Sequence, residues 1–444
     1  MKNFIDKVLL YINITYIFIY PQKVPVPITY KNLVVNIIWF SINKYFKFSF
    51  IFFVRLIWKI FFDFIKIIYL PISICFYFSK YRFIQINYFQ IGSMGEQLKY
   101  MVEYNCLRNK KSLIFIPRTQ TRSHIKKIFI NLNIIDSIIL NFLALPLIHT
   151  NFISCDTTIS NALYDTSGDR IGKDHPLKIV QKFEKKFGNS LDIFKLNQHY
   201  VDEMEKHFAN KFKNFDIKKT IILHVRDESF LSTSYLRNAS FENYFSTIKY
   251  LLDNGYFVIR LTHSKSKILK FTDSYKELNT DDSFNQFFQY YLISKCKGLM
   301  CCSSGPASLG ALLNTPILQI NIFSYSTYAT KKNDVYLLKK VKNKDNELSS
   351  YIDLFKMDFF YTYAASLVRM NQKGYVAIEN TEDEILEATK EFIELNNNNF
   401  HNMNDDQKSF TQNIPKKSGF GCVESRISSY FQKKYPELFK QKIN

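Results

Sequence analysis

Apolar and polar positions change period along the chain, and from about residue 81 onward they follow the rhythm of strands that alternate with helices. Short apolar runs such as Thr220–Arg226 (TIILHVR) and Tyr256–Leu261 (YFVIRL) predict strands, and the amphipathic stretch Phe241–Asp253 between them predicts a helix. Gly255 stands where that helix should end, in the left-handed conformation that glycine adopts easily. Strands and helices that alternate at this spacing predict an α/β fold with a doubly wound parallel sheet.

The same alternation starts earlier, in a first unit that precedes Thr220. A strand, a glycine-containing turn, a helix and a parallel strand are predicted at Arg82–Asn87, Ile91–Glu96, Gln97–Leu107 and Ser112–Pro117. Such a strand–loop–helix–strand unit is of mononucleotide-binding type, although GSMG is far from a diagnostic phosphate-binding motif. The apolar run at 134–148 fits a helix or a buried strand, and the stretch at 191–212 predicts a helix.

These patterns divide the chain into four parts. They are an apolar segment at 1–80, a first Rossmann-like domain at 81–216, a second at 217–395, and a linker with a C-terminal helix at 396–444. The two Rossmann-like domains are expected to face each other across a cleft. Thr381 and Glu384 have the spacing of a helix capping box, 396–412 is rich in Asn and Asp, and 421–439 predicts one more helix.

Residues 1–80 are strongly apolar but repeatedly interrupted by charge, and no charge-free run reaches the roughly 20 residues that a spanning helix needs. Between residues 46 and 70 the pattern fits a helix with a charged side and a wide apolar face. The charges are Lys47, Arg55, Lys59, Asp63 and Lys66, and the apolar face is Phe50, Phe53, Ile57, Ile60, Phe61, Phe64 and Ile68. This pattern is typical of a helix that lies in a membrane interface. A helical layer buried in the protein, or a single true span, is the alternative.

The chain has 444 residues, a formal net charge of +20 and 17% aromatic residues. Eleven lysines and arginines against two aspartates give residues 1–83 a net charge of +9. The basic balance points to an anionic partner. Much of the excess positive charge lies in the apolar segment, so we expect the anionic partners to be a membrane surface and a phosphorylated ligand rather than nucleic acid. We expect the protein to lie on the cytoplasmic face of the inner membrane, as a peripheral or monotopic protein. The seven cysteines lack the spacing of a zinc site, so a zinc site is not expected. No cofactor is expected either.

The stretch Gly298–Asn321 (GLMCCSSGPASLGALLNTPILQIN) predicts a short strand, a tight Ser303-Ser304-Gly305 turn, a helix that opens at Pro306, and a second strand. A helix start offers unpaired N–H groups and the positive end of the helix dipole, so it binds anions readily. Gly305 lets the backbone approach a ligand, and Pro306 fits the first helical position, where no N–H is needed. An ordinary strand–turn–helix connection of an α/β domain would have the same pattern. The choice between an anion site and such a connection depends on the rest of the chain.

Basic residues gather at the same edge of the predicted sheet. His224 and Arg226 end one strand on the same face. Arg237 follows on a loop, and Arg260 lies on the next strand. Guanidinium groups suit a phosphate or a diphosphate. Each arginine also has an ordinary alternative. Arg226 could pair with the neighbouring Asp227 or Glu228, and Arg237 and Arg260 could be solvated or capping charges. Together with the helix start the arginines predict a polyphosphate site.

Three stretches resemble a bacterial family of GT-B glycosyltransferases associated with surface polysaccharide synthesis. They are HVRDESF, YLRNASFENYFSTIKYLLDNGYFVIRL and KCKGLMCCSSGPASLGALLNTPILQIN. The His-x-Arg strand end and the serine–glycine helix start are also similar to those of fucosyltransferase-type GT-B enzymes. The resemblance covers roughly residues 218–394 and, more faintly, the Gly92 loop. It implies a metal-independent transferase, of hexosyl or fucosyl type, that moves a sugar from a nucleotide-sugar donor to a surface glycan or lipid-linked saccharide.

Carried onto this chain, the resemblance implies that Arg226 and the Ser303-Ser304-Gly305 turn hold the nucleotide diphosphate, with His224 and Arg237 nearby. Arg260, and Asn321 at the end of the second strand, are counted with this donor-binding set.

A general base should come from the first domain, and we expect Glu96 to serve in that role. Asp165, Asp169 and His175, on the polar loop at 157–176, are its rivals. Ser93 stands where the family pattern has a histidine, and Thr262 stands where it has a glycine. These two departures leave open a second interpretation, a non-catalytic nucleotide- or glycan-binding protein on the same fold.

Overall fold

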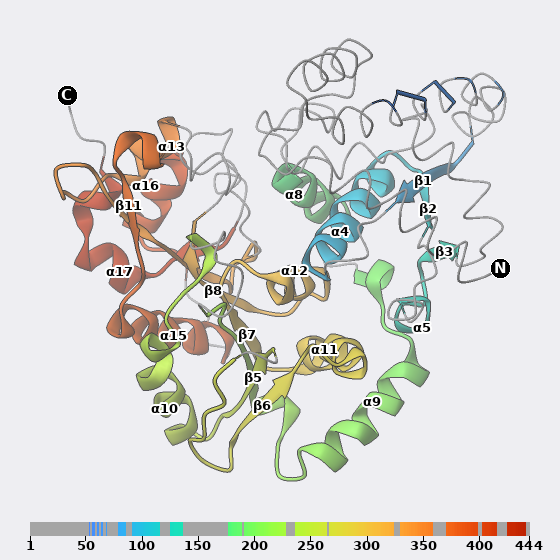
Figure 1. The fold of residues 1–444 in the computed structure, drawn as a ribbon, viewed down its shortest axis with the longest axis horizontal. Coiled ribbons are helices and arrows are strands. Elements are labelled where there is room, and N and C mark those ends of the chain that lie inside the picture. Colours follow the sequence, from blue (N-terminus) through green and yellow to red (C-terminus); the bar gives the residue numbers. More distant parts are fainter. Residues whose placement is uncertain are drawn as a thin grey trace. The chain divides into compact units, whose positions relative to one another are not determined.

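The structure is a computed structural model, and it describes most of the chain from residue 79 onward (Figure 1). The described residues are 79–85, 91–115, 125–135, 176–188, 191–227, 236–263, 266–323, 329–357, 370–397, 402–414 and 424–440, together with seven positions between 53 and 68. Contacts divide the chain into two compact units. Unit 1 is Met1–Ile86, Asn105–Ser123 and Asn133–Asn161, and unit 2 is Asn87–Tyr104, His124–Leu132 and Ala162–Asn444.

Unit 1 contains a three-stranded parallel sheet in the order β1-β2-β3. Its strands are β1 (Tyr81–Gln85), β2 (Lys111–Phe115) and β3 (Asn133–Ile135). Ile84 and Ile114 pair in register and are fully buried, and the Asn105 amide donates to the Ser112 hydroxyl at 3.1 Å where the chain enters β2. The predicted pair of parallel strands is therefore confirmed, and the run at 134–148 begins as a strand.

Unit 2 is built on a seven-stranded, wholly parallel sheet in the order β12-β9-β8-β7-β4-β5-β6. Its strands are β4 (Thr220–His224), β5 (Phe257–Thr262), β6 (Tyr275–Asn279), β7 (Gly298–Cys301), β8 (Ile317–Ile322), β9 (Val335–Leu338) and β12 (Arg426–Ile427). Every residue of β7 and β8 is buried, as expected of central parallel strands that are covered on both faces.

Helices cover both faces of this sheet. Figure 1 shows α10 and α15 on one face and α11 and α12 on the other, and both α12 and α15 contact β8. The helices of unit 2 are the first part of α4 (Ile91–Leu107), α5 (Ile125–Ile128), α8 (Pro176–Phe187), α9 (Gln198–Lys211), α10 (Phe245–Asp253), α11 (Ser283–Lys295), α12 (Gly305–Leu312), α13 (Tyr351–Lys356), α15 (Glu382–Asn396), α16 (Asp405–Asn413) and α17 (Ser429–Lys434). Short 3-10 turns are η1 (Leu191–Phe194), η2 (Ile217–Lys219), η4 (Phe241–Tyr244) and η6 (Pro436–Phe439), and β10 (Lys340–Lys342) pairs with β11 (Val376–Ile378) in a small antiparallel ribbon.

Local sequence signals set several of these boundaries. Gly255 has φ +76° and ends the α10 region, and the Thr381 hydroxyl and Glu384 carboxylate form the expected capping box at the start of α15. These observations, with the parallel sheets, confirm an α/β fold.

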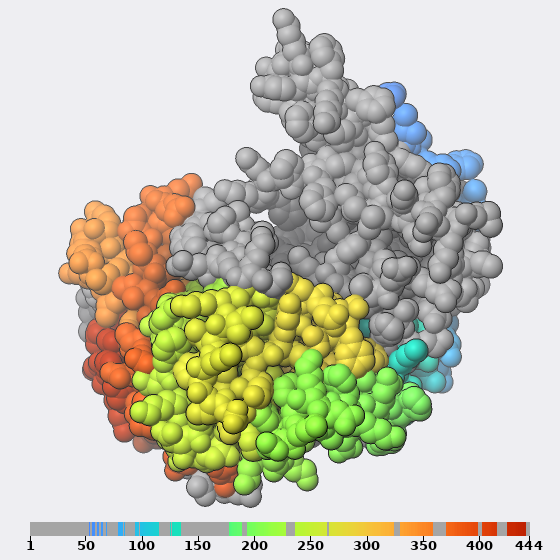
Figure 2. Space-filling view, turned by 60° about the horizontal axis from the view of Figure 1, so that its bottom comes forward, coloured from blue at the N-terminus to red at the C-terminus, as the bar shows by residue number. Residues whose placement is uncertain are grey.

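Some local expectations differ from the structure. The Gly92–Gly95 segment is not a loop, because α4 already begins at Ile91. The stretch at 396–412 contains α16, and the tail contains the edge strand β12 followed by α17 and η6 rather than one helix. Figure 2 shows the orange and red C-terminal residues lying directly beside the yellow-green residues of unit 2. Sequence pattern missed β12 because two residues carry no measurable period.

Candidate functional site

The strand order places the ends of β4 and β7 side by side. The chain runs from β4 outward through β5 to β6, and then returns to start the other half of the sheet at β7. His224 pairs with Cys301, and the Cys302 N–H donates to the His224 carbonyl oxygen at 3.2 Å. In open α/β sheets, ligands bind at the carboxyl ends of the strands where the strand order reverses. This switch point is therefore the candidate site.

The helix start that the sequence predicted lies at this switch point. Ser304 is the N-cap residue of α12, but its side chain makes no capping hydrogen bond. Its hydroxyl oxygen is buried without a hydrogen bond of ordinary geometry, with the weakly polar Cys302 thiol beside it. Pro306 stands in the first turn, as predicted. The start of α12 thus keeps backbone and hydroxyl groups for a ligand.

Close packing fixes α12 against the sheet. A Cβ atom added at Gly310 would lie 2.6 Å from Leu299 Cδ2, so only glycine fits where the helix crosses β7. Ser303 is also locked, because its hydroxyl accepts a hydrogen bond from Gln319 Nε2 on β8 at 3.3 Å. The turn is therefore pre-formed rather than shaped by a ligand.

Arg226 and Arg237 are both tied to groups around this turn. Arg226 is 7% exposed, and its Nε donates to Asn238 Oδ1 at 3.3 Å. Arg237 is partly exposed, and its Nε donates to the carbonyl oxygen of Ser303 at 2.9 Å. The Ala239 N–H returns to the Arg226 carbonyl oxygen at 2.8 Å. The two arginines predicted from separate stretches therefore lie at one edge of the sheet with the α12 start.

His224 belongs to the same group but carries no charge at neutral pH. Burial, and then the nearby Arg226, Arg260 and Arg237, lower its pKa to about 3, against a small opposing effect of Asp227. Its Nδ1 is buried without a hydrogen-bond partner. A neutral imidazole can donate or accept a hydrogen bond, so His224 can orient a ligand but does not add positive charge to the site.

Arg260 is brought to the same edge but is held in the protein interior. It is 1% exposed, and its guanidinium forms ion pairs with Asp227 at 3.2 Å and Glu277 at 3.0 Å. The ring of Phe241 lies 3.6 Å from its central carbon, in cation–π geometry. Arg260 is therefore neither a solvated nor a capping charge, and its ion pair with Asp227 supports the end of β4. Its assignment to the donor site stays a prediction.

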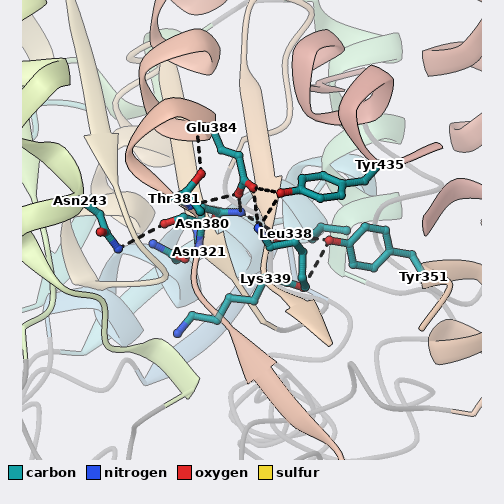
Figure 3. A network of polar contacts seen from close by, with 10 residues as sticks. Asn243, Asn321, Leu338, Lys339, Tyr351, Asn380, Thr381, Glu384 and Tyr435 are labelled. Atoms are coloured by element: carbon teal, nitrogen blue, oxygen red, sulfur yellow. Dashed lines mark hydrogen bonds and ion pairs between the residues drawn. The ribbon is translucent and has the colours of Figure 1, made fainter. Parts of the chain in front are cut away.

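Asn321 is likewise engaged inside the protein, as Figure 3 shows. It has φ +57° and is fully buried, and its N–H donates to Asn380 Oδ1 at 2.9 Å while the Asn380 N–H donates to Asn321 Oδ1 at 2.7 Å. Asn380 also donates to the Leu338 carbonyl oxygen at 3.0 Å. This reciprocal pair joins the end of β8 to the start of α15, so Asn321 has a structural role.

Glu96, the expected base, lies in the second turn of α4 and is 7% exposed. The preceding Gly95 lies against α12, since an added Cβ would be 3.0 Å from Ser308 Oγ. The helix that carries Glu96 therefore packs on the helix whose start forms the candidate site. The rival residues Asp165, Asp169 and His175 lie outside the described residues. The role of Glu96 stays a prediction.

One basic residue at this edge was missed by the sequence analysis. Lys339 follows β9, is 2% exposed, and donates from Nζ to the carbonyl oxygen of Asn238 at 2.7 Å. The run VYLLKK predicts a strand and says nothing about a ligand. The one available signal was a lysine at the end of a strand that is otherwise wholly apolar.

Metal ligands do not cluster in the part of the chain that the structure describes, where no three His, Cys, Asp or Glu side chains lie close enough to hold an ion. The four described cysteines, Cys106, Cys296, Cys301 and Cys302, are free thiols. Metal independence stays a prediction.

Seven positions between residues 53 and 68 of the apolar N-terminal segment are described, and all seven are helical. Six of them, all but Leu56, carry large apolar side chains that are about half exposed, with exposed fractions from 48% for Phe61 to 63% for Phe64. Among the described residues, no helix is both long and apolar enough to cross a membrane.

Comparison with known proteins gives distant structural likeness. Neither a family model nor a curated protein matches the sequence. A glycosyl transferase family 9 structure from Veillonella parvula DSM 2008 has 11% identity and a TM-score of 0.42, over 70% of this chain and 97% of that one. The ADP-heptose lipopolysaccharide heptosyltransferase II of E. coli has 14% identity and a TM-score of 0.33, over 54% and 84%. The beta Kdo 2,4 transferase KpsC of Thermosulfurimonas dismutans has 15% identity and a TM-score of 0.21, over 37% and 55%. Since every TM-score is below 0.5, we base neither fold nor activity on these alignments. By its own sheets and helices the chain is an α/β protein with a candidate anion site at a strand switch point.

Proposed function

We propose that the chain is a glycosyltransferase that moves a sugar from a nucleotide-sugar donor to a surface glycan or a lipid-linked saccharide. One observation carries the proposal. The uncapped start of α12, Arg226 and Arg237 meet at the switch point between β4 and β7. A helix start with two guanidinium groups beside it suits the diphosphate of a nucleotide sugar, and the sequence resemblance to GT-B transferases supports the same ligand.

The chemistry would be a substitution at the anomeric carbon. The acceptor hydroxyl oxygen forms the new bond, the bond from the anomeric carbon to the diphosphate oxygen breaks, and the nucleoside diphosphate leaves with the electron pair. Arg226, Arg237 and the first N–H groups of α12 would stabilise the charge that grows on that oxygen. Glu96 is the proposed acceptor of the hydroxyl proton, because it lies on the helix that packs on α12.

We also propose that residues 46–70 hold the enzyme on an anionic membrane surface. Six described residues support the proposal, because they lie in helical segments and their large apolar side chains are about half exposed. They are Phe53, Ile57, Ile60, Phe61, Phe64 and Ile68. The intervening Arg55, Lys59 and Lys66 supply the positive charge that anionic lipid headgroups attract. A lipid-linked acceptor would then lie in the same membrane surface as the enzyme.

The proposal is tested by binding and then by turnover. Purified protein is heated with a panel of nucleoside diphosphates, one of which should raise the unfolding temperature, since a ligand at 100 times its Kd adds about 2.7 kcal/mol of stability. The corresponding nucleotide sugars are then assayed for release of the nucleoside diphosphate. Binding without release from any nucleotide sugar would favour the non-catalytic alternative, and no binding at all would remove the donor site.

A further inference from the structure

Two consecutive lysines at the end of β9 are both buried, but among the described residues only Lys340 has a carboxylate within ion-pair distance. The ammonium of Lys340 pairs with the Glu384 carboxylate and also donates to Tyr435 OH at 3.3 Å. Lys339 is 2% exposed, and its Nζ makes one hydrogen bond, to the neutral carbonyl oxygen of Asn238. No carboxylate among the described residues lies within ion-pair distance of Lys339 Nζ. Lys340 is therefore a structural ion-pair residue, whereas Lys339 is a buried lysine without an ion pair among the described residues.

A buried lysine without an ion pair lowers the stability of the folded state. An ammonium has three donors, and a buried charge without a counter-charge destabilises the folded state unless it is compensated. Burial accordingly lowers the pKa of Lys339, although the carboxylate of Glu379 opposes the shift. That carboxylate accepts from the Ser240 N–H at 2.8 Å instead. A packed apolar side chain would suit the same position better if stability alone decided it.

The main chain holds Lys339 firmly in this position. Its N–H donates to the Ile322 carbonyl oxygen at 2.9 Å, and Tyr351 OH donates to its carbonyl oxygen at 3.3 Å. In Figure 3 the Lys339 side chain extends away from the cluster formed by Asn380, Glu384 and Tyr435. It leads to Asn238, whose side chain accepts from Arg226. Lys339 is thus directed from β9 to the edge where the α12 start lies.

We propose that Lys339 is a further anion-binding residue of the candidate site, and that the phosphate groups of the ligand supply the direct ion pair that no described carboxylate forms with it. This inference rests on the proposed function, since it assigns Lys339 to the same diphosphate. The dipeptide Arg237-Asn238 is the common scaffold. Arg237 contacts Ser303 of the α12 turn. Asn238 contacts Arg226, at the end of β4, and Lys339, at the end of β9.

The first test measures binding of inorganic pyrophosphate and of the nucleoside diphosphates to the full-length chain by calorimetry. Lys339→Met keeps the length of the side chain and removes its charge, and we expect it to weaken binding by at least tenfold. Lys339→Arg should retain most of the affinity. The matched control is Lys342→Met, on β10 and half-buried, which should stay within twofold of the wild type.

The second test distinguishes ligand binding from a structural role. Lys339→Met should unfold at the same or a higher temperature than the wild type without ligand, but gain less stability from ligand. An anion that binds beside Lys339 should also raise its pKa, so binding takes up a proton between the free and bound pKa values. Calorimetry in buffers of different ionisation enthalpy measures this uptake. It should grow as the pH rises through the lowered pKa of the free protein, and it should vanish in Lys339→Met.

The ionisable groups that act on Lys339 are Glu379 and Cys302, and Arg226 contacts the same Asn238; the substitutions leave all three residues unchanged. Wild-type binding together with unchanged affinity and proton uptake in Lys339→Met would overturn the inference and leave the donor site standing. Failure of the wild type to bind pyrophosphate or any nucleoside diphosphate would overturn both. A Lys339→Met chain that is less stable without ligand and binds normally would make Lys339 a structural residue.

Discussion

The guanidinium of Arg237 donates a hydrogen bond to the carbonyl oxygen of Ser303, 66 residues further along the chain, at 2.9 Å. Ser303 directly precedes the N-cap residue of α12. The contact therefore joins the loop after β4 to the turn after β7, two segments that meet only because the sheet reverses its strand order between them.

Arg226→Met should weaken binding of the nucleoside diphosphate by about 10- to 150-fold, because a hydrogen bond to a charged group contributes about 1.5–3 kcal/mol. Folding should be largely intact. Lys276→Met, at an exposed position of β6, is the control and should leave the Kd unchanged. Calorimetry on the three proteins measures the effect, and an unchanged Kd for Arg226→Met would remove this arginine from the site.

Arg260→Met should act mainly on stability. The substitution leaves the carboxylates of Asp227 and Glu277 without their guanidinium, and breaking a buried ion pair costs about 3 kcal/mol. Urea unfolding measures the loss. The double variant Arg260→Met/Glu277→Gln should recover part of it, because the stranded charge is then removed. A fully stable Arg260→Met with weaker donor binding would instead place Arg260 on the ligand.

His224 should make the protein less stable as the pH falls. Its folded pKa is about 3, and an unperturbed histidine titrates near 6.5, so the unfolded chain binds the proton more tightly. The contribution to stability is complete above about pH 6.5 and is lost as the pH falls toward 3, by at most about 1.4 kcal/mol per pH unit.

The pH effect is measured by urea unfolding at pH 7.5 and pH 5. His224→Gln should lose less stability between these two values than the wild type does. His199→Gln, at an exposed position of α9, should behave like the wild type. Equal losses in the His224 variant and the wild type would mean that the imidazole takes up its proton in the folded state.

Asn321 should tolerate glycine better than valine. Both substitutions remove the amide that pairs with Asn380, at a cost of about 1–3 kcal/mol for the buried groups left unpaired. Valine adds strain, because a β-branched residue is rarely found at a φ of +57°. Thermal unfolding should therefore rank wild type above Asn321→Gly, and Asn321→Gly above Asn321→Val. The opposite order for the two variants would show that the left-handed backbone is not retained.

The proposed membrane surface predicts co-sedimentation with vesicles that contain anionic lipid. Binding should fall as salt is added, because the headgroup attraction is screened. The double variant Phe64→Ser/Ile68→Ser removes two of the exposed side chains and should reduce binding severalfold, whereas Ile268→Ser, an exposed isoleucine of unit 2, should not. Equal vesicle binding by both variants would exclude this face as the anchor.

The sequence by itself determined the elements and several of their ends. Period and capping residues predicted the strands β4, β5, β7 and β8, the glycine stop after α10 and the Thr381–Glu384 capping box. These features depend on residues close together in the chain, so local pattern suffices. The α12 helix start was predicted for the same reason.

Only the tertiary structure decided which charged residues share an environment. Arg226 and Arg260 were both counted with the donor-binding set from the sequence, but the sheet order gives Arg260 two internal carboxylates and places Arg226 and Arg237 beside the α12 turn. Lys339 joins them from β9 and was not predicted. Burial and charge pairing depend on which strands become neighbours, and strand order is set by packing between segments that are far apart in the chain.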